Sequence, residues 1–375
     1  MSQPDEFYRG RVGFEHLPGT ILRRRSVDLP SLDGGGRAWQ IVYATRTGFS
    51  APIPASATVV SPATVDVAGS GATLVYCPQF HGLGGSCAPS QLLARGEEPE
   101  AGFIAAALHR GWTVAVPDGP GLGMTDVGYH QFLAGKVSAH TVLDLARAVR
   151  DMPELDAAES PCAVWGFGDG GRTAIWAGET HREYAAELDL RGVAAGAVVA
   201  DPGALIREID GGPWAGLALA GLIGLGRAYR HLPVDHVLLE SGRQVIKRAA
   251  TLDAADIQVD YRHQPLGQWC ERPDPWNDPM WRYVLANEKS ARVAPRVPVH
   301  LYHGTEDALV PVAMGRELFA AYRALGVDLS WREYHTSHLG CAADGAAEAI
   351  SRLAGYLQRR PTPAGPPPPP AAQTT

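Results

Sequence analysis

A glycine-rich turn between an apolar strand and a helix is the part of the sequence best suited to position chemistry. The segment reads Cys162-Ala163-Val164-Trp165-Gly166-Phe167-Gly168-Asp169-Gly170-Gly171-Arg172. Flanking glycines let a chain turn sharply enough to hold the residue at the tip in a strained conformation, where a nucleophile is normally found. Here the tip is Gly168, which has neither hydroxyl nor thiol. The sequence therefore predicts that no covalent acyl intermediate forms at this turn.

Two later loops carry residues for acid-base chemistry. A strand expected at Val297 to Tyr302 leads to Glu306 and Asp307, and a strand expected at Leu329 to Tyr334 leads to His338. We expect Asp307, with Glu306 as the alternative, to orient His338 and support its positive charge. That pairing leaves a general base near neutral pH. A loop histidine bonded to backbone and a turn-forming aspartate remain the alternative interpretations.

The elements that position these residues alternate between strand and helix. Antiparallel strands are expected first, at Ala38 to Thr47 and Ala57 to Val65. Further strands are then expected at Thr73 to Cys77, Thr113 to Val116, Cys162 to Gly166 and Ala194 to Val199. Helices are expected at Ala101 to Arg110, Ala139 to Asp151, Arg172 to Leu188, Ala313 to Leu325 and Ala343 to Gln358. This alternation predicts an α/β fold with a doubly wound, mostly parallel sheet, whose ligands bind at the carboxyl ends of the strands.

The alternation stops between about Asp201 and Ser290, where helical stretches such as Asp235 to Leu252 appear. We expect residues 201–290 to form a mainly helical cap, inserted into a core of residues 1–200 and 291–360. A second independent domain is the alternative. The apolar stretch Pro213 to Gly226 is too short and too rich in glycine to span a bilayer, so it predicts a buried helix. Residues 361–375 contain five consecutive prolines and predict a disordered or polyproline tail.

Composition narrows the function further. The 375 residues carry 33 basic and 40 acidic side chains, a net charge of -7, which is a poor match for nucleic acid or an anionic membrane. The five cysteines show neither CxxC pairs nor metal-ligand spacing, and we predict no metal and no cofactor. The first residues lack the basic-then-apolar pattern of a secretory signal, so a cytoplasmic location with reduced thiols is expected.

These motifs together resemble the secretory-lipase-like branch of the α/β-hydrolases, over about Phe7 to Leu357. The resemblance rests on Pro18 to Arg23, the Cys87-Ala88-Pro89-Ser90 block, Asp118 to Gly123, the glycine turn and the two loops with Asp307 and His338. The position of the nucleophile, the acid and the histidine follow one another in the order typical of this fold. In that family, His-Gly usually follows the first central strand, and an Asp two residues before the Cys87 block helps to form the oxyanion hole. Here those positions hold Pro78-Gln79 and Gly85.

The resemblance implies that both the nucleophile and an oxyanion stabiliser are missing while the base is kept. Such a base can remove a proton next to a carbonyl, so that an acyl group at the β position leaves as a carboxylate and a double bond forms. This lyase reaction is similar to the acetate elimination of α/β-hydrolase-like proteins in tetronate polyketide biosynthesis. The expected substrate is an acylated small molecule, a polyketide-type natural-product intermediate. Five residues are expected either in the former oxyanion region or in contact with the substrate: Gln79, Phe80, His81, Gly85 and Asp169. For Gln79 and His81, a plain loop role is the alternative.

Other functions stay open at this point. Gly168 is also compatible with a serine esterase or lipase that has lost its nucleophile, or with a non-catalytic binding protein. Gly166, Gly168 and Gly171 satisfy the dinucleotide pattern G-x-G-x-x-G between a strand and a helix. The turn lies in the middle of the expected sheet, however, and the nearest acid that closes a later strand, Asp201, is about thirty residues further on. The oligomeric state is not predicted.

Overall fold

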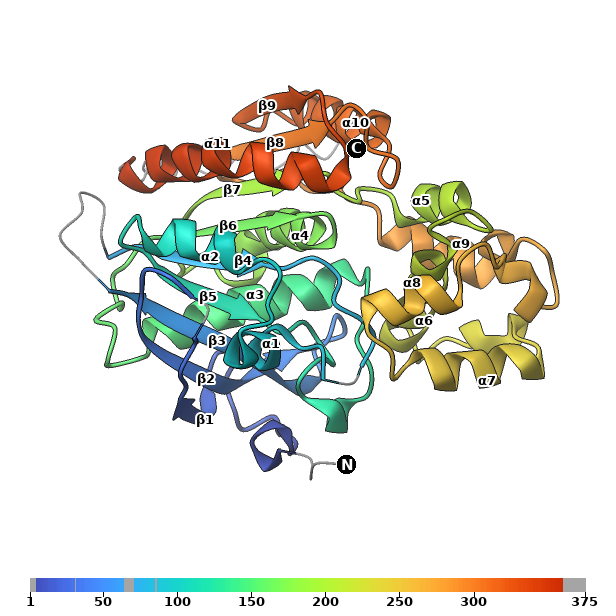
Figure 1. Cartoon of the computed structure of the whole chain (residues 1–375), viewed down its shortest axis with the longest axis horizontal. Helices are drawn as coiled ribbons and strands as arrows, with labels where there is room; N and C mark the ends of the chain where they lie inside the picture. Colours follow the sequence, from blue (N-terminus) through green and yellow to red (C-terminus); the bar gives the residue numbers. More distant parts are fainter. Residues whose placement is uncertain (1–4, 31, 64–70, 85, 360–375) are drawn as a thin grey trace, which may run out of the picture.

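A nine-stranded sheet runs through the larger part of the molecule (Figure 1). The computed structural model describes residues 5–30, 32–63, 71–84 and 86–359. In spatial order the strands are β1 (Ile21–Ser26), β2 (Gly35–Arg46), β3 (Pro52–Pro62), β5 (Thr113–Pro117), β4 (Thr73–Cys77), β6 (Cys162–Phe167), β7 (Leu190–Gly196), β8 (Val299–Gly304) and β9 (Leu329–Tyr334). The pairs from β1 to β5 along this order are antiparallel, and those from β5 to β9 are parallel. The expected doubly wound α/β fold is confirmed.

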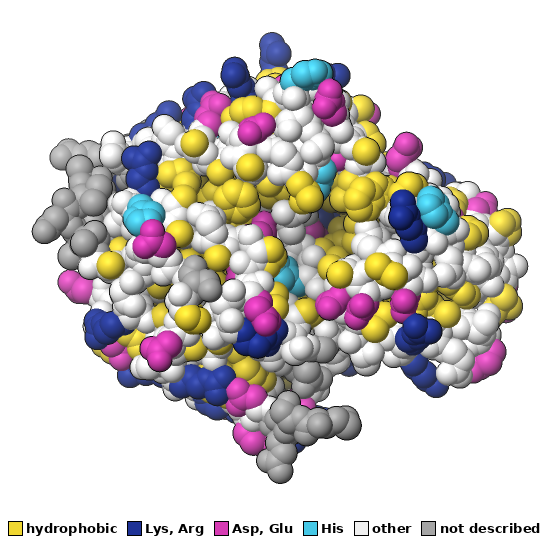
Figure 2. Space-filling view, viewed as in Figure 1, with side chains coloured by type: hydrophobic (Ala, Val, Ile, Leu, Met, Phe, Trp, Pro, Cys, Tyr) yellow, Lys and Arg dark blue, Asp and Glu magenta, His cyan; other side chains and the backbone are white. Residues whose placement is uncertain are grey.

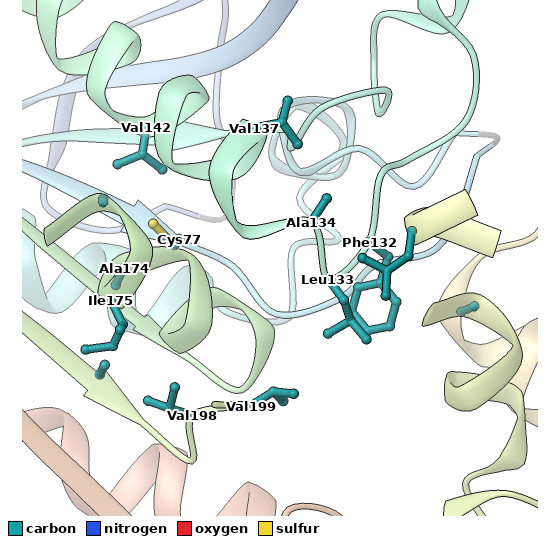
Figure 3. Close-up of a cluster of buried hydrophobic side chains, with 14 of the residues drawn as sticks. Cys77, Phe132, Leu133, Ala134, Val137, Val142, Ala174, Ile175, Val198 and Val199 are labelled. Carbon is teal, nitrogen blue, oxygen red and sulfur yellow. The ribbon is translucent and has the colours of Figure 1, made fainter. Parts of the chain in front are cut away.

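The central strands are buried on both faces, which is why they are apolar throughout instead of alternating. In β4, Val75 and Cys77 pack into one hydrophobic core, whereas Leu74 and Tyr76 pack into a second core on the opposite face. Because successive side chains of a strand point to opposite faces, one short strand serves both cores. Figure 3 shows part of the first core, which extends from Cys77 and Ile175 to Phe132 beside the helical insertion.

Helices cover both faces of the sheet. Outside residues 201–290, the helices that contribute side chains to the first core are α3, α4 and α10, and those that contribute to the second are α1, α2 and α11. The helices outside the insertion are α1 (Pro89–Arg95), α2 (Ala101–Leu108), α3 (Gly135–Arg150), α4 (Asp169–Tyr184), α10 (Val312–Ala324) and α11 (His338–Gln358), with short 3-10 turns at η1 (Glu6–Tyr8) and η2 (Thr125–Val127). Within the described ranges, no helix combines the length and the apolar character needed to cross a bilayer.

Between β7 and β8 the chain forms a mainly helical segment, residues 201–290, which we call the insertion. It lies beside the carboxyl ends of the parallel strands (Figure 1). It contains α5 (Pro202–Ile209), α6 (Ala215–Ala228), η3 (Val234–Val237), α7 (Glu240–Ala249), α8 (Ala254–Asp260), η4 (Leu266–Trp269), η5 (Pro275–Asn277) and α9 (Pro279–Asn287). The helix predicted from Pro213 to Gly226 is α6. A Cβ at Gly224 would lie 2.4 Å from the backbone nitrogen of Phe132, so this glycine lets α6 approach the core closely.

Several boundaries differ from the sequence predictions. The edge strand β1 was not predicted, because its ILRRRS sequence places three arginines where alternation would be sought. The strand expected to end at Val199 ends at Gly196, and the helical stretch expected from Asp235 to Leu252 is divided into η3 and α7. The predicted proline-rich tail lies outside the described residues.

Candidate active site

The glycine turn joins β6 directly to α4 and places Gly168 at its tip, with φ 58° and ψ −119°. A Cβ on Gly170 would lie 1.9 Å from the carbonyl oxygen of Cys77, and one on Gly166 would lie 2.2 Å from the carbonyl oxygen of Gly170. These two glycines are therefore required by the close packing of the turn against β4. A Cβ on Gly171 would also lie 2.6 Å from the carbonyl oxygen of Gly196, so packing accounts for two of the three glycines of the dinucleotide pattern, Gly166 and Gly171.

Position 168 itself is different, because a Cβ there would find space. Its nearest neighbours would be Gln79 Oε1 at 3.5 Å and His338 Nε2 at 3.6 Å, both ordinary contact distances. The positive φ is a conformation that side chains other than glycine rarely adopt. The turn thus keeps the geometry of a nucleophile elbow around a residue that has no nucleophile.

His338 and Asp307 are brought together at this turn from two different loops. His338 is the first residue of α11, and its Nδ1 lies 2.6 Å from Asp307 Oδ2. Asp307 Oδ1 accepts hydrogen bonds from the backbone N–H groups of Leu309 and Val310, at 2.9 Å and 2.8 Å. With Nδ1 committed to Asp307, Nε2 is left facing the turn. The imidazole is therefore oriented by a fixed carboxylate.

Asp307 is kept ionised by its surroundings. Burial opposes the charge, but hydrogen bonding to His303 and His338 outweighs burial and lowers the pKa of Asp307 well below its usual range. Glu306, the alternative acid, points away, since its carboxylate lies 3.3 Å from the exposed His335. Asp307 is therefore the carboxylate that faces the imidazole.

Gln79, in the loop after β4, turns an acceptor toward the site. Its backbone N–H donates to Glu100 Oε2 at 2.8 Å, and its side-chain Nε2 donates to Glu100 Oε1 at 3.1 Å. Tyr76 donates a third hydrogen bond to the same carboxylate, at 3.0 Å. Because the amide nitrogen is held by Glu100, the amide oxygen is the atom nearest to position 168. The first backbone N–H after β4 is thus occupied, although this loop normally supplies an oxyanion-hole donor.

The other residues predicted near the former oxyanion hole are placed differently. His81 is buried between Glu98, 3.0 Å from its Nε2, and the carbonyl oxygen of Gln79, 2.6 Å from its Nδ1. Burial opposes its charge, but the Glu98 carboxylate outweighs burial and raises the pKa of His81 to about 9. Phe80 packs against Phe132, with ring centroids 4.1 Å apart. Gly85 lies outside the described residues.

Asp169, the first residue of α4, lines a small pocket on the side of the turn toward β5. The pocket also involves residues that sequence reasoning did not assign. The buried Asp118 accepts hydrogen bonds from the backbone N–H and the hydroxyl of Ser90, at 2.7 Å and 2.6 Å. This pair joins the Asp118 to Gly123 segment to the Cys87 block. The signal for Asp118 in the sequence was its place as a single aspartate directly after a buried strand.

A buried ion pair ties the turn to the insertion. Arg172 Nη2, in the first turns of α4, lies 2.7 Å from Glu288 Oε2 at the end of α9. Glu288 also accepts hydrogen bonds from the hydroxyl of Tyr229 in the insertion and the backbone N–H of Gly135 at the start of α3. The carboxylate of Glu288 therefore connects α3 and α4 to the insertion.

The surface is hollowed where the core meets the insertion, and apolar side chains gather along one rim of this hollow (Figure 2). No group of three His, Cys, Asp or Glu side chains in the described part of the chain is arranged to hold a metal ion. The described side chains at the turn offer a base, an amide oxygen and a carboxyl group.

The chain is similar to known lipases in sequence and in structure. The family described as Secretory lipase matches residues 88–365. A protein of Mycobacterium tuberculosis described as a probable inactive lipase is 27% identical over 357 residues, which cover 90% of this chain and 78% of that protein. A secreted triacylglycerol lipase of Malassezia globosa is 28% identical over 373 residues, covering 92% and 77%. Lipase A of Candida antarctica in its closed state superposes with a TM-score of 0.83 at 21% identity, over 95% of this chain and 87% of that chain.

These comparisons correct one expectation from the sequence. The cytoplasmic location is wrong, because the family is described as secretory and the Malassezia globosa relative is named a secreted lipase. The expected α/β-hydrolase fold and the resemblance to secretory lipases are confirmed. The chain belongs to the secretory lipase family.

Proposed function

We propose that this protein is a non-hydrolytic member of its family that eliminates a carboxylate from an acylated small molecule. In this proposal His338 is the base, Asp307 orients it, and the product is an alkene with a free carboxylic acid. The observation that carries the proposal is the intact pair of Asp307 and His338, 2.6 Å apart, facing a turn without a nucleophile.

Hydrogen bonding at the turn argues in the same direction. A tetrahedral intermediate needs preorganised donors for its oxyanion, and loss of one donor costs about 100- to 1,000-fold in kcat. Here Glu100 takes the backbone N–H of Gln79 and one N–H of its side-chain amide, and the amide oxygen of Gln79 faces the site instead. An oxygen atom at this place disfavours a developing oxyanion but accepts a hydrogen bond from a substrate hydroxyl or amide.

The proposed reaction begins with His338. Its Nε2 removes a proton from a carbon next to a carbonyl, and the released electron pair forms a double bond to the neighbouring carbon. The bond from that carbon to the acyloxy oxygen breaks, and the acyl group departs as a carboxylate. Asp307 stays ionised and stabilises the imidazolium during the step. No bond to the protein forms, so no nucleophile is required.

The substrate class follows from the surroundings. The apolar rim in Figure 2 suits a largely hydrophobic molecule, and we propose that the insertion acts as a cap that excludes water from it. A polyketide-type intermediate with an acetyl ester, such as a tetronate, meets these requirements. The similarity to a protein described as a probable inactive lipase supports the loss of hydrolysis.

Product analysis tests the proposal. Purified protein is incubated with acetylated tetronates and with ordinary acetate esters, and the products are resolved by mass spectrometry. Free acetic acid together with the alkene is expected from the tetronates, and no turnover is expected from the simple esters. Free acid together with the alcohol would instead identify an esterase. No turnover of any substrate by a folded protein would support a non-catalytic role.

A further inference from the structure

The pocket next to the glycine turn is small, and its lining is polar on one side. Asp169, Thr173, Ser138, His130 and Gln79 contribute polar side chains, and prolines close it from the loops that follow β4 and β5. The space for the centres of water-sized groups is about 40 Å³. A water molecule needs about 10–15 Å³ by this measure, so the pocket accommodates only a small group.

Asp169 is the notable group in this lining. Its carboxyl group has no hydrogen-bond or ion-pair partner among the residues that the structure describes, although the neighbouring carboxylates of Asp118 and Glu100 each have several. Its backbone N–H, at the start of the 16-residue helix α4, is likewise without a partner within the described ranges. A free N–H at a helix N-terminus favours an anion.

The charges around Asp169 come from several elements. The same pocket is lined by Cys77 on β4, His81 in the following loop, Asp118 after β5 and His130 before α3, and Arg172 on α4 itself acts on Asp169 through its charge. Burial dominates and raises the pKa of Asp169 to about 7, although Arg172 opposes the shift. Burial also lowers the pKa of His130 to about 4, so this imidazole is neutral near pH 7. The carboxyl group of Asp169 therefore holds its proton in weakly acidic solution.

We propose that this pocket binds the leaving acyl group, and that Asp169 is the catalytic acid that protonates the departing carboxylate. The small size of the pocket favours a short acyl group, such as that of an acetyl ester. This inference rests on the proposed elimination. The backbone N–H of Asp169 binds one oxygen of the leaving group while the carboxyl proton is given to the other.

The proton balance closes over one turnover. His338 gains the proton taken from carbon, the carbon-oxygen bond breaks with its electron pair on the acyloxy oxygen, and Asp169 supplies a proton to that oxygen. The products are an alkene and neutral acetic acid. Solvent then carries the proton from the His338 imidazolium to the Asp169 carboxylate, which restores both groups.

Binding of sodium acetate tests the pocket without any turnover. Saturation-transfer NMR is recorded with acetate, propionate and pivalate on the full chain, Asp169→Ala and Asp169→Asn. Asp256→Asn is the matched control, because Asp256 is an exposed aspartate in the first turn of α8. We expect acetate to bind at pH 6 and to weaken at least tenfold by pH 8, pivalate to give no signal, and Asp169→Ala to lose acetate binding at both pH values. The control should match the unaltered protein.

Asp169→Asn separates the acid from the hydrogen-bond donor. This variant should bind acetate equally at pH 6 and pH 8, because an amide donates a hydrogen bond at both pH values. If ionisation of Asp118 caused the loss of acetate binding at high pH instead, that loss would persist in this variant, because burial raises the pKa of Asp118 to about 6. Equal acetate binding by Asp169→Ala, or pivalate binding as strong as that of acetate, would overturn the inference. If acetate binds as expected but acetylated substrates give no alkene, the proposed elimination fails while the pocket assignment stands.

Discussion

Gln79 gives its backbone N–H and one N–H of its side-chain amide to the single carboxylate of Glu100, through contacts of 2.8 Å and 3.1 Å. Glu100 is buried, and burial raises its pKa although the donors of Gln79 oppose the shift. The contact fixes the orientation of the amide, so that oxygen and not nitrogen faces position 168. Position 168, which carries no nucleophile, is therefore faced by an amide oxygen and not by the amide nitrogen. Four predictions follow from the site and the residues that support it.

Replacement of the base should abolish elimination. His338→Ala removes the proton acceptor and is expected to lower kcat by about 100- to 10,000-fold, which is the usual contribution of general base catalysis. Asp307→Asn should lower kcat by a similar factor, since the imidazole loses its charged partner. Alkene formation is measured by mass spectrometry. His335→Ala is the control, because His335 is exposed and three residues away. Full activity in His338→Ala would exclude it as the base.

Restoring a nucleophile should restore little hydrolysis. Gly168→Ser places a hydroxyl near His338, but the backbone at φ 58° strains a serine, at a cost of about 1–3 kcal/mol in the free energy of unfolding. We expect slow release of 4-nitrophenol from its acetate ester. Addition of Glu100→Ala frees the backbone N–H of Gln79 and should raise the rate by about 10- to 100-fold.

The exposed Glu97→Ala provides the comparison for that double variant. If Glu97→Ala and Glu100→Ala change the Gly168→Ser rate equally, the N–H of Gln79 is not the missing donor.

The buried Glu179 should make stability depend on pH. Burial raises its pKa to about 7, although hydrogen bonds from Tyr322 and Ala291 oppose the shift. An exposed glutamate titrates at about 4.3, so the folded state holds this proton longer than the unfolded state. Stability is therefore full at low pH and falls as pH rises from about 4 to 7. Glu179→Gln should remove on the order of 1–3 kcal/mol of that fall.

Urea unfolding at a series of pH values measures this effect. Glu183→Gln, four residues along α4 and exposed, should leave the slope unchanged. A slope remains in Glu179→Gln, because burial also raises the pKa of Asp144 to about 6. Equal slopes in the two variants would contradict the assignment to Glu179.

Loss of the carboxylate at Glu288 should destabilise the protein strongly. Glu288→Ala leaves the Arg172 guanidinium buried without its charged partner, which typically costs about 3–5 kcal/mol. Glu288→Gln keeps hydrogen bonding and should cost less. Both are compared with the exposed Glu208→Ala by urea unfolding. A Glu288→Ala variant as stable as this control would mean that Arg172 finds another partner.

The sequence was sufficient for the parts of the fold that depend on local pattern. Thr73–Cys77 and Leu329–Tyr334 are strands with the predicted bounds, because runs of five and six residues between turns are too short for a typical helix. The glycine turn was recognisable because its backbone geometry requires glycine. The contact between Gln79 and Glu100 was not predictable, since it joins two loop residues 21 positions apart through side-chain orientation. Asp169 was predicted as a residue of the former oxyanion region or a substrate contact, but its unpartnered carboxyl group is visible only in three dimensions.

The loop that carries Gln79 is also bound to the insertion. Gly82 forms an antiparallel bridge with Asp253, Leu83 N–H donates to the carbonyl oxygen of Leu252 at 3.0 Å, and Ala254 N–H donates to that of His81 at 2.9 Å. A hinged swing of the insertion as one body would pull this loop with it, and with the loop the amide that faces Gly168. The insertion and the orientation of the Gln79 amide are thus mechanically linked, and displacement of one would disturb the other.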